Sequence, residues 1–126
     1  MRNDSTFSAV TVPNGWQRAI VHNDSHHPNR QRSNICHELS HCFLGHKCVP
    51  PLTETGSRIH DGGIEEEANF LAGCLLITNE AALHIVSNGL ESQAQELYGV
   101  SLQMLNYRLR ISGARTIYKN RQGKSA

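Results

Sequence analysis

The sequence has almost no surplus of charge and no long hydrophobic run. Lysine and arginine together number 12 and aspartate and glutamate 11, so the formal net charge is +1. Such a balance provides no overall field that would attract nucleic acid or an anionic membrane. No apolar stretch approaches the roughly 20 residues of a membrane helix, and MRNDSTFSAVTV at the N-terminus lacks the apolar centre of a signal peptide. We therefore expect a cytoplasmic protein.

The Cys-x-x-Cys spacing of structural zinc sites is also absent. The cysteines are Cys36, Cys42, Cys48 and Cys74, an even number that in a short secreted chain would suggest disulfides. No export signal supports that reading. Cys36 and Cys42 would lie on one helix, about 9 Å apart along its axis, which is too far for a bridge. We expect reduced cysteines, with Cys42 and Cys74 serving as small buried apolar residues.

Length and apolar pattern predict one α+β domain. A chain of 126 residues has room for a single modest core, and we expect 1–126 to form one domain with flexible ends at 1–6 and 117–126. STFSAVTV and WQRAIVHN are short β-type runs on either side of Pro13-Asn14-Gly15. Asn-Gly between apolar runs is a strong signal for a β-hairpin.

A helix is predicted after this hairpin. The polar stretch 24–32 contains Pro28 and predicts a loop, after which Ser33 is suited to cap a helix that ends at Gly45. The apolar stripe expected to bury one face of this helix consists of Ile35, Leu39, Cys42 and Phe43. The following stretch, 47–63, is broken by proline and glycine and predicts a long loop, of the kind that is often functional.

The C-terminal half is predicted to be helical. Helical spacing runs from Ile64 to Ile77, and Asn79 is suited to cap the next helix, which stops at Gly89. ESQAQELY and LQMLNYRLRI predict two more helices on either side of a Gly-Val-Ser turn. The basic, polar tail TIYKNRQGKSA is expected to be frayed.

NICHELSHCFLGH is the stretch with the clearest chemistry. On a helix His37 and His41 project from one face about one turn apart, so both can reach a single ion. Glu38 stands roughly 100° around the helix, beside the ion rather than on it. Zinc lowers the pKa of bound water, and a nearby carboxylate can take the proton. His-Glu-x-x-His also arises by chance, but here it lies inside an amphipathic helix, with its histidines beside the apolar stripe.

A catalytic zinc site usually has three protein ligands and one open position. The predicted helix that begins with IEEEAN offers the third ligand, for which Glu65 is the first candidate and Glu67 the rival. Asn69, one turn after Glu65, can hydrogen-bond the second ring nitrogen of His37 or His41 and so support a ligand histidine. The simpler interpretation is that these glutamates only stabilise the positive end of a helix dipole.

Hydrolysis of a peptide also requires a donor to the oxyanion of the tetrahedral intermediate. The candidates are His46, His60, Tyr98 and Tyr107, and the sequence does not choose among them. For each of them, a surface or packing role is the commoner one.

Three segments together resemble a known family. RQRSNICHELSHCFLGH, EEEANFLAGCLL and LYGVSLQMLNYRL follow the order and spacing of the ImmA/IrrE zinc metallopeptidases. That family has His-Glu-x-x-His, then Glu-x-x-Ala-Asn/Asp with a following Phe-Ala and Leu-Leu, then a Val-Ser-x-x-x-Leu-x-x-Arg-Leu helix. Leu71 replaces the phenylalanine of the Phe-Ala pair, and Thr78 replaces a proline after the paired leucines.

The resemblance implies a minimal zincin-like α+β domain, with a small twisted sheet packed on a helix bundle and the His-Glu-x-x-His helix in the core. It implies that His37, His41 and Glu65 bind Zn²⁺ and that Glu38 is the catalytic glutamate of a gluzincin-type endopeptidase. It also implies a role in transcription regulation, with a helix-turn-helix repressor as the protein substrate. The helices often found ahead of the sheet in that family are not seen here, which implies a reduced cleft.

Two other classes of function compete with the protease. SQAQELYGVSLQMLNYRLR resembles a helix-turn-helix, in which Arg108 and Arg110 would meet DNA phosphates. Its leucines, however, supply a core-facing stripe, and the chain has no basic surplus. The second competitor is a metal-stabilised regulatory module that binds a partner without turnover. The glutamate at position 38 favours catalysis, because a purely structural site needs only the metal ligands.

Overall fold

The computed structural model describes residues 7–47 and 62–125 of the chain. It confirms the α+β class, with two strands and six helices in the described part. They are β1 (Ala9–Asn14), β2 (Gln17–His22), α1 (Pro28–Phe43), α2 (Gly62–Leu76), α3 (Asn79–Ser87), α4 (Ala94–Tyr98), α5 (Leu102–Ser112) and α6 (Ala114–Ser125). The chain divides into two compact units, 1–72 and 73–126, so the single domain expected from the sequence stays a prediction.

Length and hydropathy decide whether a helix of the described segments could cross a membrane. None of these helices alone is both long and apolar enough to cross a membrane. Joined across the bend between them, α2 and α3 satisfy length and composition together, as core helices of globular proteins also can.

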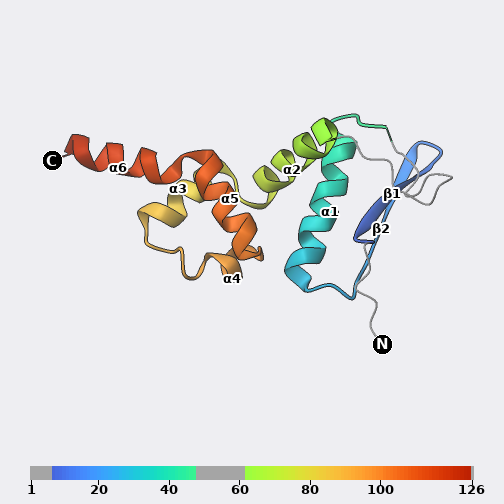
Figure 1. Cartoon of the computed structure of the whole chain (residues 1–126), viewed down its shortest axis with the longest axis horizontal. Coiled ribbons are helices and arrows are strands. Elements are labelled where there is room, and N and C mark those ends of the chain that lie inside the picture. The colour runs from blue at the N-terminus through green and yellow to red at the C-terminus, as the bar shows by residue number, and fades with distance from the viewer. Residues whose placement is uncertain (1–6, 48–61, 126) are drawn as a thin grey trace. The chain divides into compact units, whose positions relative to one another are not determined.

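The first unit contains the predicted hairpin, which lies beside α1 (Figure 1). β1 and β2 are antiparallel, with Ala9 opposite His22 and Asn14 opposite Gln17. The two-residue loop begins at Gly15, whose φ of +65° is a conformation that glycine adopts without strain. Ala9 and Thr11 are buried, as expected for alternate residues of a strand with one covered face.

α1 begins at Pro28 and not after Ser33, so the predicted loop and cap were wrong. Proline is favourable at the first helical position because its fixed φ suits a helix and its missing N–H has no helical partner there. His27 is the actual cap, since its Nδ1 accepts a hydrogen bond of 3.0 Å from the backbone N–H of Asn29. Pro28 was predicted to break the helical pattern, whereas it starts the helix.

The buried face of α1 also differs from the predicted apolar stripe. The buried residues of this helix are Glu38 and Ser40, whereas Phe43 is 65% exposed. Ser40 satisfies its hydroxyl within the helix by donating to the carbonyl of Cys36 at 2.8 Å. Cys42 is half-buried rather than buried, and so is Cys74. The cysteines in the described segments are free thiols, as predicted, while Cys48 lies outside those segments.

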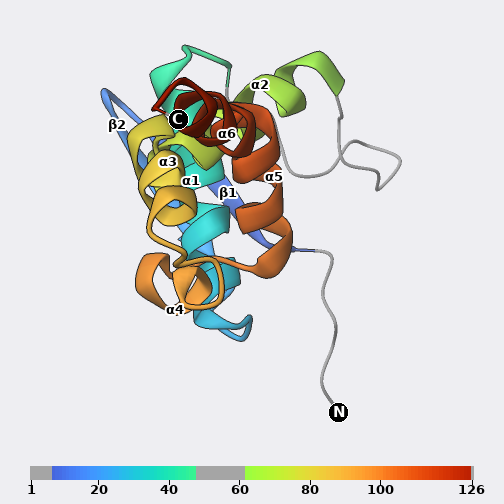
Figure 2. The ribbon, with the colours of Figure 1, turned by 90° about the vertical axis from the view of Figure 1, so that its left-hand side faces the viewer.

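The second unit forms its own hydrophobic core. α3 packs against α5 and α6, as both views show (Figures 1 and 2). The buried apolar residues of this core are Ile77, Ala82, Ile85, Ala94, Val100, Leu105, Leu109 and Ala114. Thr78 caps α3 by accepting from the N–H of Ala81 at 3.0 Å, so the prediction that Asn79 is the cap was wrong by one residue.

The C-terminal residues are helical where the sequence predicted a frayed tail. α6 follows Gly113, whose φ of +70° ends α5 and turns the chain. Ala114 is buried in the core, and the exposed Arg115 pairs with Glu91 at 2.8 Å. Composition suggested fraying because most of α6 is polar, but a helix needs only one apolar face when another helix covers it. Residues 1–6, the other end expected to be flexible, lie outside the described segments.

Arg108 is fully buried in the second unit, so it cannot meet a DNA phosphate as the helix-turn-helix alternative required. Its Nε donates to the carbonyl of Ile77 at 2.7 Å, and one of its terminal nitrogens donates to Oδ1 of Asn79 at 2.7 Å. A guanidinium presents several donors in a fixed plane, which allows this double contact. Arg108 thus joins α5 to the turn between α2 and α3.

We predict that Arg108→Met lowers the free energy of unfolding by about 2 kcal/mol, because the buried carbonyl of Ile77 and the amide oxygen of Asn79 both lose their donor. The exposed Arg110 of the same helix provides the control, and Arg110→Met, which loses the contact with the Tyr107 ring, should change stability by less than about 1 kcal/mol. Urea unfolding followed by circular dichroism measures both. Equal stability of the two variants would contradict the proposed role of Arg108.

Candidate metal centre

Two histidines on α1 bring their ring nitrogens together. His37 and His41 stand four residues apart, and their Nε2 atoms are 3.1 Å from each other. The rings are perpendicular, with centroids 4.6 Å apart, so they do not stack. Their side chains are only 20% and 15% exposed. The predicted spacing therefore places two nitrogen ligands at one point.

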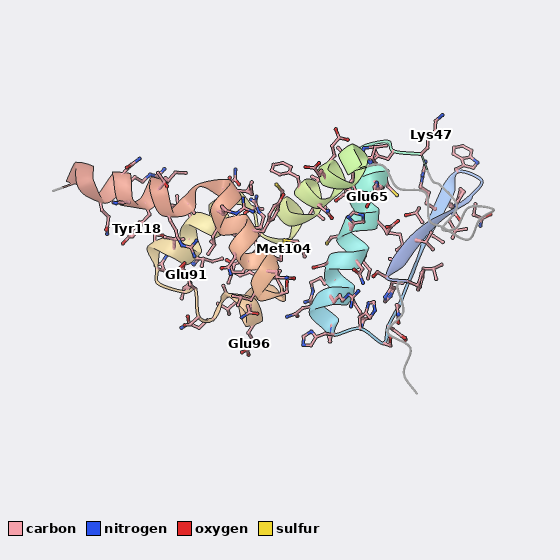
Figure 3. The ribbon with its side chains drawn as sticks, in the orientation of Figure 1. Lys47, Glu65, Glu91, Glu96, Met104 and Tyr118 are labelled. Atoms are coloured by element: carbon pink, nitrogen blue, oxygen red, sulfur yellow. The ribbon has the colours of Figure 1, made fainter. Side chains whose placement is uncertain are left out.

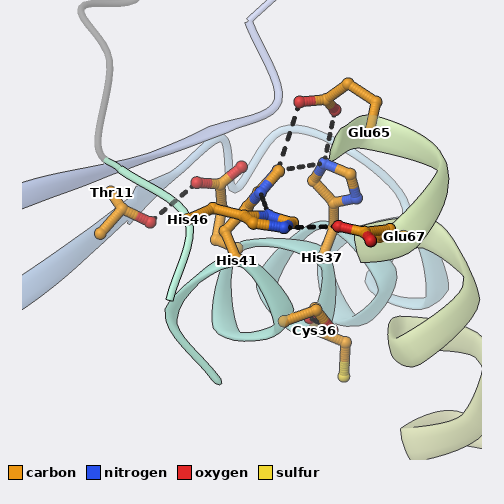
Figure 4. A network of polar contacts seen from close by, with 9 residues as sticks. Thr11, Cys36, His37, His41, His46, Glu65 and Glu67 are labelled. Carbon is orange, nitrogen blue, oxygen red and sulfur yellow. Dashed lines mark hydrogen bonds and ion pairs between the residues drawn. The ribbon is translucent and has the colours of Figure 1, made fainter. Parts of the chain in front are cut away.

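Glu65 completes this arrangement from α2. Its Oε1 lies 2.9 Å from Nε2 of His37, and its Oε2 lies 3.3 Å from Nε2 of His41. Glu65 belongs to the first turn of α2 and lies beside α1 (Figures 3 and 4). A glutamate that only stabilised a helix dipole would have no reason to contact both histidines. All three residues lie in the first unit.

These three side chains fit a metal ion. In a tetrahedral zinc site, bonds of about 2.0–2.1 Å place neighbouring ligand atoms about 3.3–3.4 Å apart. The separations here are 2.9, 3.1 and 3.3 Å. Two neutral imidazoles and a carboxylate are a typical donor set for zinc. Oxygen and nitrogen lone pairs this close repel one another unless protons or a cation lie among them.

Glu38 is the most deeply buried carboxylate of this region, at 5% exposed. Its Oε1 accepts a hydrogen bond of 2.8 Å from Oγ1 of Thr11, on β1. One donor atom each from His37, Glu38 and His41 lies within 4.8 Å of the others, so distance alone would also admit Glu38 as a ligand. Glu65 is the better third ligand, because each of its oxygens contacts one histidine directly.

The environment of His41 favours the form that binds metal. Burial is the main cause that lowers the pKa of its imidazole below the ordinary value, and His37 acts in the same direction. The carboxylates of Glu65 and Glu38 oppose this shift without reversing it. His41 is therefore neutral at neutral pH, as a ligand histidine must be.

Cys36 lies next to His37 but is not prepared to act as a nucleophile. Burial raises the pKa of its thiol, and the charge of Arg32 offsets only part of that increase. The thiolate is the reactive and metal-binding form, so this cysteine stays inert at neutral pH.

The other predicted site residues differ in where they lie. Asn69 is exposed on α2 and makes no hydrogen bond with the residues that the structure describes, so its supporting role stays a prediction. His60 lies outside the described segments. Tyr98 and Tyr107 belong to the second unit, where the Tyr107 ring contacts the guanidinium of Arg110.

Two contacts of the site were not predicted from the sequence. Thr11 was assigned to a strand. The alternation of side chains along a strand predicts which face is covered, but not which helical residue lies against that face. Glu67 was considered only as a rival ligand, whereas its Oε1 lies 2.8 Å from Nε2 of His46. His46 in turn contacts His41, with their Nδ1 atoms 2.9 Å apart. Both contacts depend on tertiary structure, and no motif in the sequence predicts them.

The geometry agrees with a comparison against known families. The family model Peptidase_M78, described as the IrrE N-terminal-like domain, matches residues 3–110. The chain belongs to this family. No curated protein and no solved structure matches the chain. Membership confirms the resemblance drawn from the motifs and supports a metallopeptidase-type function.

We predict that Thr11→Val lowers the free energy of unfolding of the metal-free protein by about 2 kcal/mol, because the buried Glu38 carboxylate loses its hydrogen bond. Thr11→Ser keeps the hydroxyl and is the matched control. Urea titration of both variants without metal gives the comparison. The assignment is wrong if valine and serine at this position are equally stable.

Proposed function

We propose that this protein is a zinc-dependent endopeptidase of the gluzincin type, with His37, His41 and Glu65 as the metal ligands. The observation that carries the proposal is the contact of the two Glu65 oxygens with the two Nε2 atoms, at 2.9 and 3.3 Å. Three protein ligands leave one position open, which is the pattern of catalytic rather than structural zinc.

When bound, zinc supplies a Lewis acid that lowers the pKa of water and polarises the carbonyl of the scissile peptide. Glu38 provides the proton transfer, taking a proton from the attacking water and passing it to the leaving amine. Thr11 holds Oε1 of this carboxylate at 2.8 Å, which leaves Oε2 to carry the proton. The buried position of Glu38 restricts its rotation and keeps this oxygen in place.

The substrate follows from family resemblance rather than from the site itself. We propose a helix-turn-helix repressor, cleaved at one position in the cytoplasm so that transcription is released.

His60 and Tyr107 stay candidates for the oxyanion donor, whereas both ring nitrogens of His46 already have partners. A metal-stabilised module without turnover is the alternative, and the buried, hydrogen-bonded Glu38 argues against it, because a structural site has no use for a general base.

We predict that the wild-type protein binds about one zinc ion per chain and that Glu65→Gln loses it on dialysis, because an amide is a weaker ligand than a carboxylate. Glu66→Gln is the matched control, since Glu66 is the exposed neighbour of Glu65 on α2 and should keep its zinc. Elemental analysis of the dialysed proteins measures the content. A wild type without zinc after loading overturns the proposed metal site.

We predict that Glu38→Gln retains zinc but cleaves the repressor about 10²–10⁴-fold more slowly, the usual contribution of a general acid-base residue. The assay incubates zinc-loaded protein with the helix-turn-helix repressor proposed as its substrate and follows the fragments by mass spectrometry. Glu66→Gln should cleave like wild type. If wild type and Glu38→Gln bind zinc equally and neither cleaves, the module without turnover is the better description.

A further inference from the structure

His46 and Glu67 form a short chain of contacts behind the metal-binding histidine His41, as Figure 4 shows. We propose that this chain, Glu67 to His46 to His41, is a carboxylate–histidine relay that holds His41 in the form that binds zinc. The inference rests on the proposed zinc site and assigns His46 as a positioning residue, not as a ligand. Partners behind a ligand histidine orient its ring and raise its affinity for the metal.

The position of His46 is fixed by the end of α1. Gly45, with a φ of +74°, turns the chain back after the helix. The backbone N–H of His46 then donates to the carbonyl of His41 at 2.9 Å. This contact places the His46 side chain against the His41 ring, with centroids 5.1 Å apart and only 11% of the His46 side chain exposed. His46 therefore has a defined orientation.

The contacts of His46 determine where its proton lies. Its Nε2 is 2.8 Å from Oε1 of Glu67, and an ionised carboxylate only accepts hydrogen bonds, so this nitrogen carries the proton. In a neutral imidazole the other nitrogen, Nδ1, is then an acceptor. That Nδ1 lies 2.9 Å from Nδ1 of His41, and one proton must lie between the two. With His46 as the tautomer that donates from Nε2 to Glu67 and accepts at Nδ1, this proton belongs to Nδ1 of His41.

The proton on Nδ1 of His41 also determines the state of its other ring nitrogen, Nε2. A neutral His41 that carries its proton on Nδ1 has a lone pair on Nε2. This is the nitrogen that faces His37 Nε2 at 3.1 Å and Glu65 Oε2 at 3.3 Å. The relay therefore presents a lone pair where the metal ligands meet, and it excludes the tautomer in which His41 would instead donate a hydrogen bond there.

His46 itself is not positioned as a ligand or as the predicted oxyanion donor. Its nearest described contact in the ligand set is with the rear nitrogen of His41, and its other nitrogen is used by Glu67. Glu67 is 64% exposed, so solvent screens its charge and its contribution is the smaller of the two.

The first test is the dissociation constant for zinc, measured by competition with a chromophoric chelator. His46→Leu should bind zinc about 10–100-fold more weakly, the usual effect of losing such a partner. His46→Asn offers an oxygen near the position of Nδ1 and should recover most of that loss. Glu67→Gln, which keeps an acceptor oxygen, should lie within a few-fold of wild type, as should the control Glu66→Gln. Circular dichroism verifies that each variant is folded.

The second test reads the proton directly in the wild-type protein. In nitrogen-15-labelled, zinc-loaded protein, the shifts of His41 should show a metal-bound Nε2 and a protonated Nδ1. A scalar coupling between the Nδ1 atoms of His41 and His46 should appear across the N–H···N hydrogen bond. A residue that merely filled space would give no such coupling.

The outcomes separate this inference from the proposed function. Zinc bound equally well by wild type and His46→Leu leaves the metal site intact and overturns the relay. A metal-bound nitrogen shift for His46 also overturns the relay, because it would make His46 a ligand. Wild-type protein that binds no zinc overturns the proposed function and the relay together. Weakened binding in His46→Leu, recovery in His46→Asn and the coupling in wild type support the relay.

Discussion

Lone pairs of nitrogen and oxygen repel one another at short distance unless a proton or a cation lies between them. This constraint shapes the first unit of the protein. Two imidazole nitrogens and two carboxylate oxygens meet at 2.9–3.3 Å, from side chains that are at most 30% exposed. In such a half-buried position a cation is worth more than it would be in water. The helical spacing of His37 and His41, and the placement of Glu65 in the first turn of α2, have a common explanation if that cation is a metal.

The residues around the meeting point of His37, His41 and Glu65 hold other side chains in position. Thr11, from β1, holds the Glu38 carboxylate, which is the proposed proton-transfer group, while His46 lies behind His41, one of the proposed ligands. These contacts come from the hairpin and from the turn after α1, and every residue that makes them lies in the first unit. The second unit has a core of its own and uses a buried arginine to hold the turn between α2 and α3. The residues of the proposed metal centre therefore lie in a small part of the chain.

Much of this site was predictable because it follows from local geometry. Residues four apart on a helix share a face, so His37 and His41 could be paired from the sequence, and the hairpin followed from Asn-Gly. Thr11 could not be assigned, because a strand pattern does not specify what covers its inner face. The role of His46 could not be assigned either, because its contacts depend on the glycine turn after α1 and on Glu67, 21 residues away. The predicted start of α1 was wrong because proline both ends and begins helices, and α6 was missed because its stability comes from packing against α3.

The most direct measurement of the central claim is X-ray absorption at the zinc edge of the loaded wild-type protein. The account predicts a shell of nitrogen and oxygen only, at about 2.0–2.1 Å, with the outer-shell scattering of two imidazoles. A sulfur neighbour at about 2.3 Å would assign the metal to a cysteine. A third imidazole would make His46 a ligand. Either result would contradict a site built from His37, His41 and Glu65.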